Sequence, residues 1–109
     1  MKLLLAFLIF TGALLAQSHS VTITIADTLN PAGTTYNVYR SPGACSATAI
    51  AGTPLATGVS VKSYVDSTVT EGSYCYAVTA VVNGLESAQS NQVTAAILPF
   101  APNITITVK

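Results

Sequence analysis

The sequence has few of the residues that enzyme chemistry uses. It contains no tryptophan and one histidine, His19, and only 7% of its 109 residues are charged. The acidic residues are not spaced as a paired acid–base site, and His19 lies near the N-terminus, away from any obvious nucleophile. Phosphate-binding glycine patterns and zinc-ligand spacings are also absent. We therefore predict a non-catalytic protein that uses no cofactor and no metal.

Charge of either sign is scarce, and it is balanced. The chain has four Lys and Arg residues and four Asp and Glu residues, and the basic residues occur singly along the sequence. A protein that neutralises phosphates needs a basic surface, so nucleic acid is excluded as a partner. Half of the residues are apolar, which is enough for a core in one small domain. Thr, Val, Ala and Ser dominate and long helix-forming runs are lacking, which indicates an all-β fold.

The N-terminal segment, residues 1–16, has the pattern of a secretory signal peptide. Lys2 is followed by an almost wholly apolar run, and the small residue Ala16 precedes the polar pair Gln17 and Ser18. A membrane anchor is the alternative, but the run of 14 residues, interrupted by Thr11 and Gly12, falls short of the roughly 20 that span a bilayer. We predict cleavage after Ala16, a secreted protein (extracellular or periplasmic), and no stable membrane anchor.

Short alternating segments predict the strands of the remaining chain. Val21, Ile23 and Ile25 share one face of a first strand, and Tyr36 and Val38 share a face of a second. The longest segment, Ser73–Val82, is apolar on both faces and therefore suits a central strand. Asn83 and Gly84 follow it and predict a hairpin turn. The further expected strands are Leu55–Thr57, Ser60–Val65, Glu86–Ile97 and Asn103–Lys109.

The two cysteines, Cys45 and Cys75, are predicted to form a disulfide, since an even number in an exported chain is normally paired. Two buried free thiols are the alternative. A metal site is less well supported because two cysteines and one distant histidine do not make a zinc set.

Four motifs in order resemble a fibronectin type III domain of the kind found in secreted bacterial proteins. They are Tyr36–Ser41, Ser63–Asp66, Gly72–Val81 and Glu86–Asn91. The resemblance covers Val21 to about Ile97 and implies an immunoglobulin-like β-sandwich. It divides the chain into a signal peptide (1–16), a domain (17–97) and a Pro-containing linker with a C-terminal strand (98–109).

The resemblance also implies structural roles for single residues. Tyr74 falls at the family's tyrosine corner, and Ile25 occupies the position at which the family usually has a core tryptophan. Tyr36, Val38 and Val78 fall on core positions of the family's strands C and F. These strands are antiparallel neighbours in the family, which would bring Cys45 close enough to Cys75 for a disulfide.

The resemblance leaves one strand missing and one in surplus. After cleavage only Gln17–Ser20 would precede the family's second strand, which is too short for its strand A. Asn103–Lys109 resembles a strand A in sequence. The segment would lie loosely, fold back on its own sandwich, or pair with another copy. In the last case the predicted interface consists of Ile104, Ile106 and Val108 against Val21 and Ile23.

The sequence therefore predicts a secreted, non-catalytic module for protein interaction or extracellular structure, with another protein or a second copy as its partner. Carbohydrate is the alternative partner, because Tyr39 and Tyr64 could present exposed rings. In that case the chain would be an accessory module of an extracellular hydrolase system.

Overall fold

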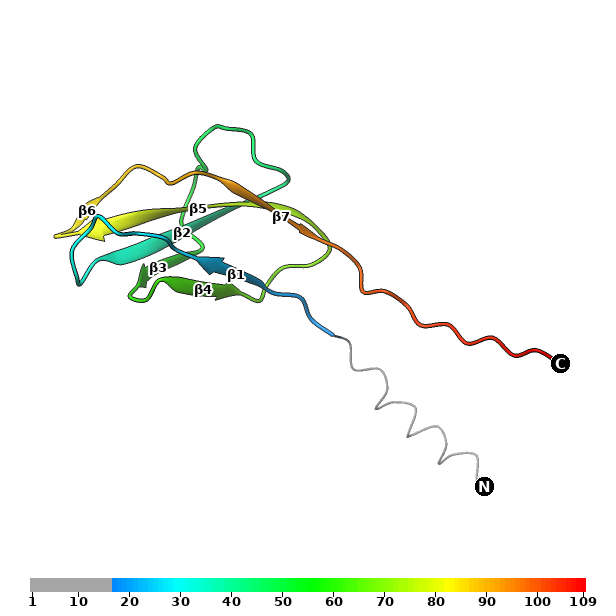
Figure 1. The fold of residues 1–109 in the computed structure, drawn as a ribbon. Helices are drawn as coiled ribbons and strands as arrows, with labels where there is room; N and C mark the ends of the chain where they lie inside the picture. Colours follow the sequence, from blue (N-terminus) through cyan, green and yellow to red (C-terminus); the bar gives the residue numbers. More distant parts are fainter. Residues whose placement is uncertain (1–16) are drawn as a thin grey trace, which may run out of the picture.

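The computed structural model describes residues 17–109, which form two antiparallel β-sheets in a sandwich-like arrangement (Figure 1). The predicted signal peptide, residues 1–16, lies outside the described residues. No helix occurs between residues 17 and 109, so the all-β prediction is confirmed for this part of the chain.

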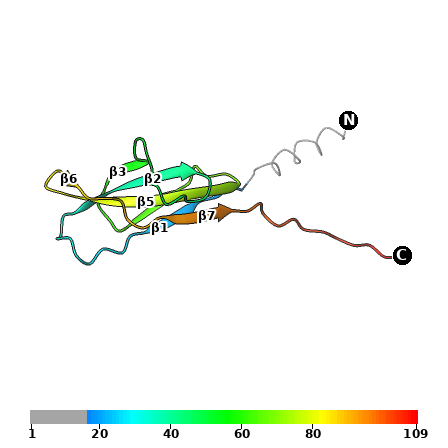
Figure 2. The ribbon, with the colours of Figure 1, turned by 90° about the horizontal axis from the view of Figure 1, so that it is seen from above.

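The two sheets differ in size. The small sheet pairs β1 (Val21–Thr24) with β4 (Ser63–Asp66). The large sheet has the order β3 (Ala56–Val59), β2 (Thr35–Pro42) and β5 (Gly72–Val82). Two further strands, β6 (Leu85–Glu86) and β7 (Val93–Ile97), lie one after the other along the free edge of β5. Figure 2 shows β2, β5 and β7 side by side.

The central strand is β5, as the two apolar faces of its sequence predicted. Tyr74, Tyr76, Val78 and Ala80 alternate with Cys75, Ala77 and Thr79. The second set is buried on the outer face of the large sheet, where Cys75 and Ala77 pack with Ile50. The first set faces the small sheet. On this inner side the fully enclosed Val38 and the buried Ile25, Tyr36 and Tyr76 form the core between the sheets.

The disulfide joins Cys75 to Cys45 in the loop that follows β2, with a Cα–Cα distance of 4.9 Å. It pins that loop over the outer face of β5. Gln89 holds the same loop from the other side, because its side-chain amide donates to the Ile50 carbonyl at 2.8 Å and accepts from the Ile50 N–H at 2.9 Å.

The β5–β6 hairpin forms as predicted, with Asn83 and Gly84 both at positive φ in the two-residue turn. The single strand predicted over Glu86–Ile97 is wrong, because the structure has two separate strands there, β6 and β7. The chain is irregular between β6 and β7 because Ser87 and Ser90 use their hydroxyls as hydrogen-bond acceptors. The N–H groups of Ala80 and Val78 donate to these hydroxyls at 2.9 and 3.0 Å, in place of backbone carbonyls.

The C-terminal strand predicted over 103–109 is also wrong. This segment is extended, carries no strand pairing and points away from the sheets (Figure 1). Its alternating sequence is compatible with a strand, but a strand also needs a neighbour to satisfy its backbone groups. The alternative in which the segment folds back on its own sandwich is not what the structure adopts.

Removing the disulfide should lower stability strongly. The bond closes a loop across a sequence separation of 30 residues. The Cys45→Ala/Cys75→Ala variant should therefore lose about 3 to 4 kcal/mol of unfolding free energy, measured by urea denaturation. Its Tm should fall by more than about 10 °C. An unchanged denaturation midpoint would show that the loop needs no covalent anchor.

Candidate functional site

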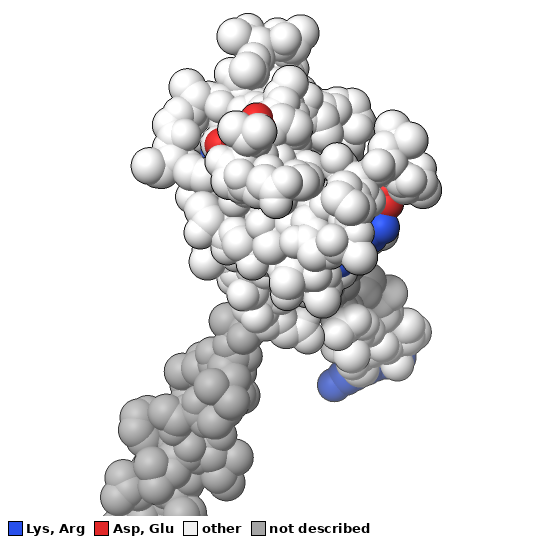
Figure 3. All heavy atoms as spheres, turned by 90° about the vertical axis from the view of Figure 1, so that its left-hand side faces the viewer, with Lys and Arg blue, Asp and Glu red and all other residues white. Residues whose placement is uncertain are grey.

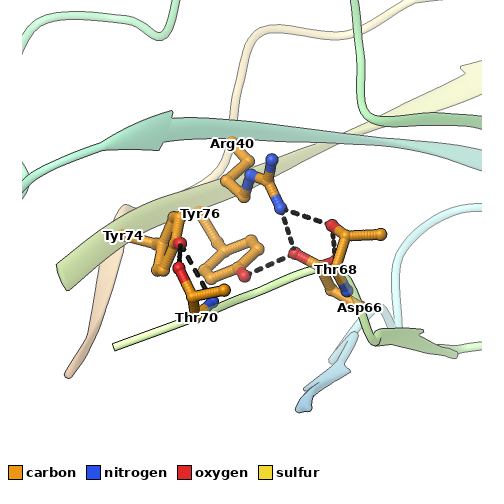
Figure 4. Close-up of polar contacts among 6 residues, drawn as sticks. All are labelled: Arg40, Asp66, Thr68, Thr70, Tyr74 and Tyr76. Atoms are coloured by element: carbon orange, nitrogen blue, oxygen red, sulfur yellow. Dashed lines mark hydrogen bonds and ion pairs between the residues drawn. The ribbon is translucent and has the colours of Figure 1, made fainter. Parts of the chain in front are cut away.

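A buried polar cluster lies between the two sheets (Figure 4). Asp66, at the end of β4, has a side chain that is only 1% exposed. The Arg40 guanidinium from β2 donates to its Oδ2 at 2.8 Å, and the Tyr76 hydroxyl from β5 donates to the same oxygen at 2.7 Å. Thr68 donates to the other carboxylate oxygen through its hydroxyl and its backbone N–H. The carboxylate therefore links three strands from both sheets.

The cluster is suited to holding structure and not to proton transfer. Burial alone would raise the pKa of Asp66, but the hydrogen bonds from Tyr76, Thr68 and Arg40 outweigh it and lower the pKa from 3.8 to about 2. Burial, together with the Asp66 charge, raises the pKa of Tyr76 well above its usual value. Both groups thus keep one protonation state around neutral pH, and both carboxylate oxygens are occupied.

Tyr74 lies next to this cluster. Its hydroxyl accepts a hydrogen bond from the backbone N–H of Thr70 at 3.1 Å, and the Arg40 guanidinium carbon lies 5.1 Å from its ring centroid (Figure 4). The bond to a backbone group four residues upstream is the kind of contact that a tyrosine corner makes.

No role for Arg40 was predicted from the sequence. Arg40 is the direct cross-strand partner of Tyr76, and both side chains face the small sheet. A lone arginine in a predicted strand, in a chain with so few charges, could have indicated that a carboxylate partner lies nearby. Its carboxylate partner could not be chosen among four acids, because the pairing depends on how the sheets face each other.

The second candidate is an apolar groove beside β1, with a cavity volume of about 380 Å³. One wall carries the inward side chains of β1, and Val78 of β5, Ser90 and Asn91 also line the groove. The opposite wall comes from Val93 and Ala95 of β7. Val93 is still 57% exposed, so the groove is open to an apolar ligand. The groove therefore lies between an edge strand of each sheet.

The edge of β1 along this groove is unpaired in the described part of the chain, where β1 bonds only to β4. The Ile25 N–H donates to the Lys62 carbonyl at 3.0 Å, on the β4 side. Hydrogen-bonding positions alternate along an antiparallel pair, so the N–H and C=O groups of Thr22 and Thr24 point to the open edge. This edge offers backbone donors and acceptors next to an apolar surface.

The C-terminal segment, residues 103–109, presents exposed apolar side chains of the kind that the groove could bury. Ile104, Ile106 and Val108 are 79%, 77% and 87% exposed, and threonines alternate with them. The structure thus places the predicted interface residues Val21 and Ile23 in the groove, while the apolar residues of the segment lie free of their own domain. It does not bring the two sets together within one chain.

His19 lies against the linker, residues 98–102, that precedes this segment. Its side chain is only 14% exposed. Its ring stacks on Phe100 with centroids 4.1 Å apart, and its Nε2 lies 3.0 Å from a Glu71 carboxylate oxygen. The segment therefore leaves the domain beside the beginning of β1.

Other kinds of site find no support among residues 17–109. No group of three or more His, Cys, Asp or Glu side chains within this range could hold a metal ion. Within the same range no helix is long and apolar enough to cross a membrane. Figure 3, which views the end of the molecule opposite the C-terminal segment, shows isolated charged residues on an uncharged surface.

Comparison with known proteins does not assign the chain to a family: no protein-family model matches it, and neither does any curated protein.

The Asp66 cluster should make the fold acid-sensitive. Because the folded-state pKa of Asp66 is lowered, its contribution is present above the unfolded pKa and lost as the pH falls from about 4 towards 2. The shift corresponds to about 2 kcal/mol. Asp66→Asn should therefore lose about 2 to 3 kcal/mol at pH 7, measured by urea denaturation, and the deficit should shrink below pH 4.

Glu71→Gln is the matched control for Asp66→Asn. Glu71 also has a lowered pKa, but its side chain is 55% exposed and its charge is screened by solvent, so its loss should leave the denaturation midpoint nearly unchanged. Equal pH profiles for the wild type and Asp66→Asn would contradict the role given to the cluster.

Proposed function

We propose that this chain is a secreted, non-catalytic module that binds an extended protein segment at the open edge of β1. The observation that carries the proposal is the apolar groove beside an unpaired strand edge. In strand addition the backbone of the edge supplies affinity and the adjacent pockets select side chains at alternate positions. Thr22 and Thr24 supply the backbone groups, and the inward side chains of β1 supply the apolar surface.

We further propose that the fold is of the fibronectin type III kind. The pairing of β1 with β4, opposite a sheet with β5 between β2 and β7, matches the order in which that family pairs its strands B, E, C, F and G. In this assignment the groove is the place that the family's strand A would occupy. The assignment explains why the groove combines an apolar lining with an unpaired strand edge, since a strand A would use both.

We favour a protein over a carbohydrate as the binding partner. Tyr39 and Tyr64, which would have presented rings to a sugar, are both half-buried. The Tyr39 hydroxyl donates to Glu86, and Tyr64 shares the inward face of β4 with Asp66. The accessory role in a hydrolase system stays a prediction without a supporting contact.

Blocking the edge should abolish binding. The probe is an array of heptapeptides in which apolar residues alternate with threonine, and binding of the full-length protein is measured by fluorescence polarisation. Thr24→Pro removes an N–H from the open edge but leaves the hydrogen bonds to β4, so binding should weaken at least about tenfold. Thr24→Ala keeps the N–H and should bind like the wild type.

Val93→Asp tests the apolar wall independently. Val93 is 57% exposed, so the fold should tolerate the charge while the groove loses its apolar character. Peptide binding that survives both Thr24→Pro and Val93→Asp would overturn the proposal.

A further inference from the structure

We propose that the strand bound in the groove is the C-terminal segment of a second copy, so that the protein assembles head to tail. Residues 103–109 of one copy would form a strand against β1 of the next. The inference rests on the proposed function, because it names the partner of the same groove. It is argued from the side-chain pattern, the direction of the chain and the length of the connection.

The side-chain patterns of the two strands match. An antiparallel register that places Ile106 opposite Ile23 also places Ile104 opposite Ile25 and Val108 opposite Val21. All six apolar side chains then point into the groove, and the three from the segment, Ile104, Ile106 and Val108, are highly exposed in the free chain. A shift by one residue would turn every isoleucine to solvent, so the pattern selects this face.

The backbone groups match in the same register. Thr105 and Thr107 would lie opposite Thr24 and Thr22, the residues whose N–H and C=O groups point to the open edge. The threonine side chains of both strands would face solvent together. Such cross-strand threonine pairs are favourable in sheets.

The direction of the segment favours a second copy over its own domain. Val21 pairs with Asp66, and Ile97 pairs with Gly72, a few residues further along the chain. The segment therefore leaves at the end where β1 begins, as the contact between His19 and Phe100 also shows. Folding back would require a sharp reversal and would give a strand parallel to β1.

A second copy in the same orientation, displaced along the line of the segment, presents β1 antiparallel to it. Figures 1 and 2 both show the segment running away from the sheets along the long direction of the molecule. The connection, residues 98–102, can span up to about 17 Å when extended. Pro99 and Pro102 favour that extended form and lack N–H groups of their own.

The donor and acceptor surfaces are different parts of the molecule, so each copy that gives its segment still has a free groove. An interface of this kind does not close on itself and produces open chains of increasing length. The end of the molecule that would meet the neighbouring copy carries only scattered charges (Figure 3), so no charged patch opposes the contact.

Sedimentation velocity of the full-length protein over a range of concentrations tests the inference. The wild type should form dimers and longer species as concentration rises. Ile106→Asp should lower the association constant by roughly 10- to 100-fold, because it replaces an isoleucine that becomes buried. Thr105→Asp adds the same charge on the solvent face, so it should still form dimers and longer species.

Mixing two variants gives the sharpest test. Ile106→Asp keeps a working groove, and Thr24→Pro keeps a working segment. Each should be monomeric alone, and an equimolar mixture should form a dimer that does not grow further, because one end of each partner is blocked. Val93→Asp replaces Thr24→Pro if the proline variant does not fold.

The outcomes separate this inference from the proposed function. A monomeric wild type whose groove still binds array peptides, and loses them in Thr24→Pro, would overturn self-assembly and leave strand addition intact. A wild type that neither associates nor binds peptides would overturn both. Association that persists unchanged in Ile106→Asp would show a different interface and overturn the inference.

Discussion

The contact of Asp66 with Arg40 and Tyr76 is the constraint on which the arrangement of the two sheets depends. The small sheet contains only β1 and β4, and a two-stranded sheet is barely stable alone in water. The Asp66 carboxylate ties the end of β4 to β2 and β5 in a buried setting where an unpaired charge would be very costly. By holding β4, the contact also holds its partner β1, which lines the groove together with β7.

The strand β5 supports both layers of the molecule. Its inner face carries Tyr76 and the core against the small sheet, and its outer face is covered by the loop that the disulfide holds. A small domain without tryptophan gains from such a covalent link, since its apolar core alone is limited. Both faces of β5 are therefore covered, and the proposed binding site lies along the unpaired edge of β1.

Much of this architecture could be read from local patterns. Alternation located β1, β2 and β5, and Asn83 with Gly84 located the hairpin, because side-chain period and turn geometry are properties of adjacent residues. The same reasoning wrongly extended a strand through Ser87 and Ser90. Their hydroxyls accept hydrogen bonds from N–H groups of β5 in place of partner-strand carbonyls, a pairing that depends on the neighbouring strand.

Residue alternation was enough to predict which side chains share a face, for β1 and for the C-terminal segment alike. Which of the two became a strand depended on the packing of the whole domain, because a strand also needs a partner for its backbone groups. Val21–Thr24 has that partner in β4, whereas residues 103–109 have none within the described range 17–109. The role of Arg40 likewise depends on the tertiary structure. Its partner Asp66 becomes buried only when the two sheets face each other.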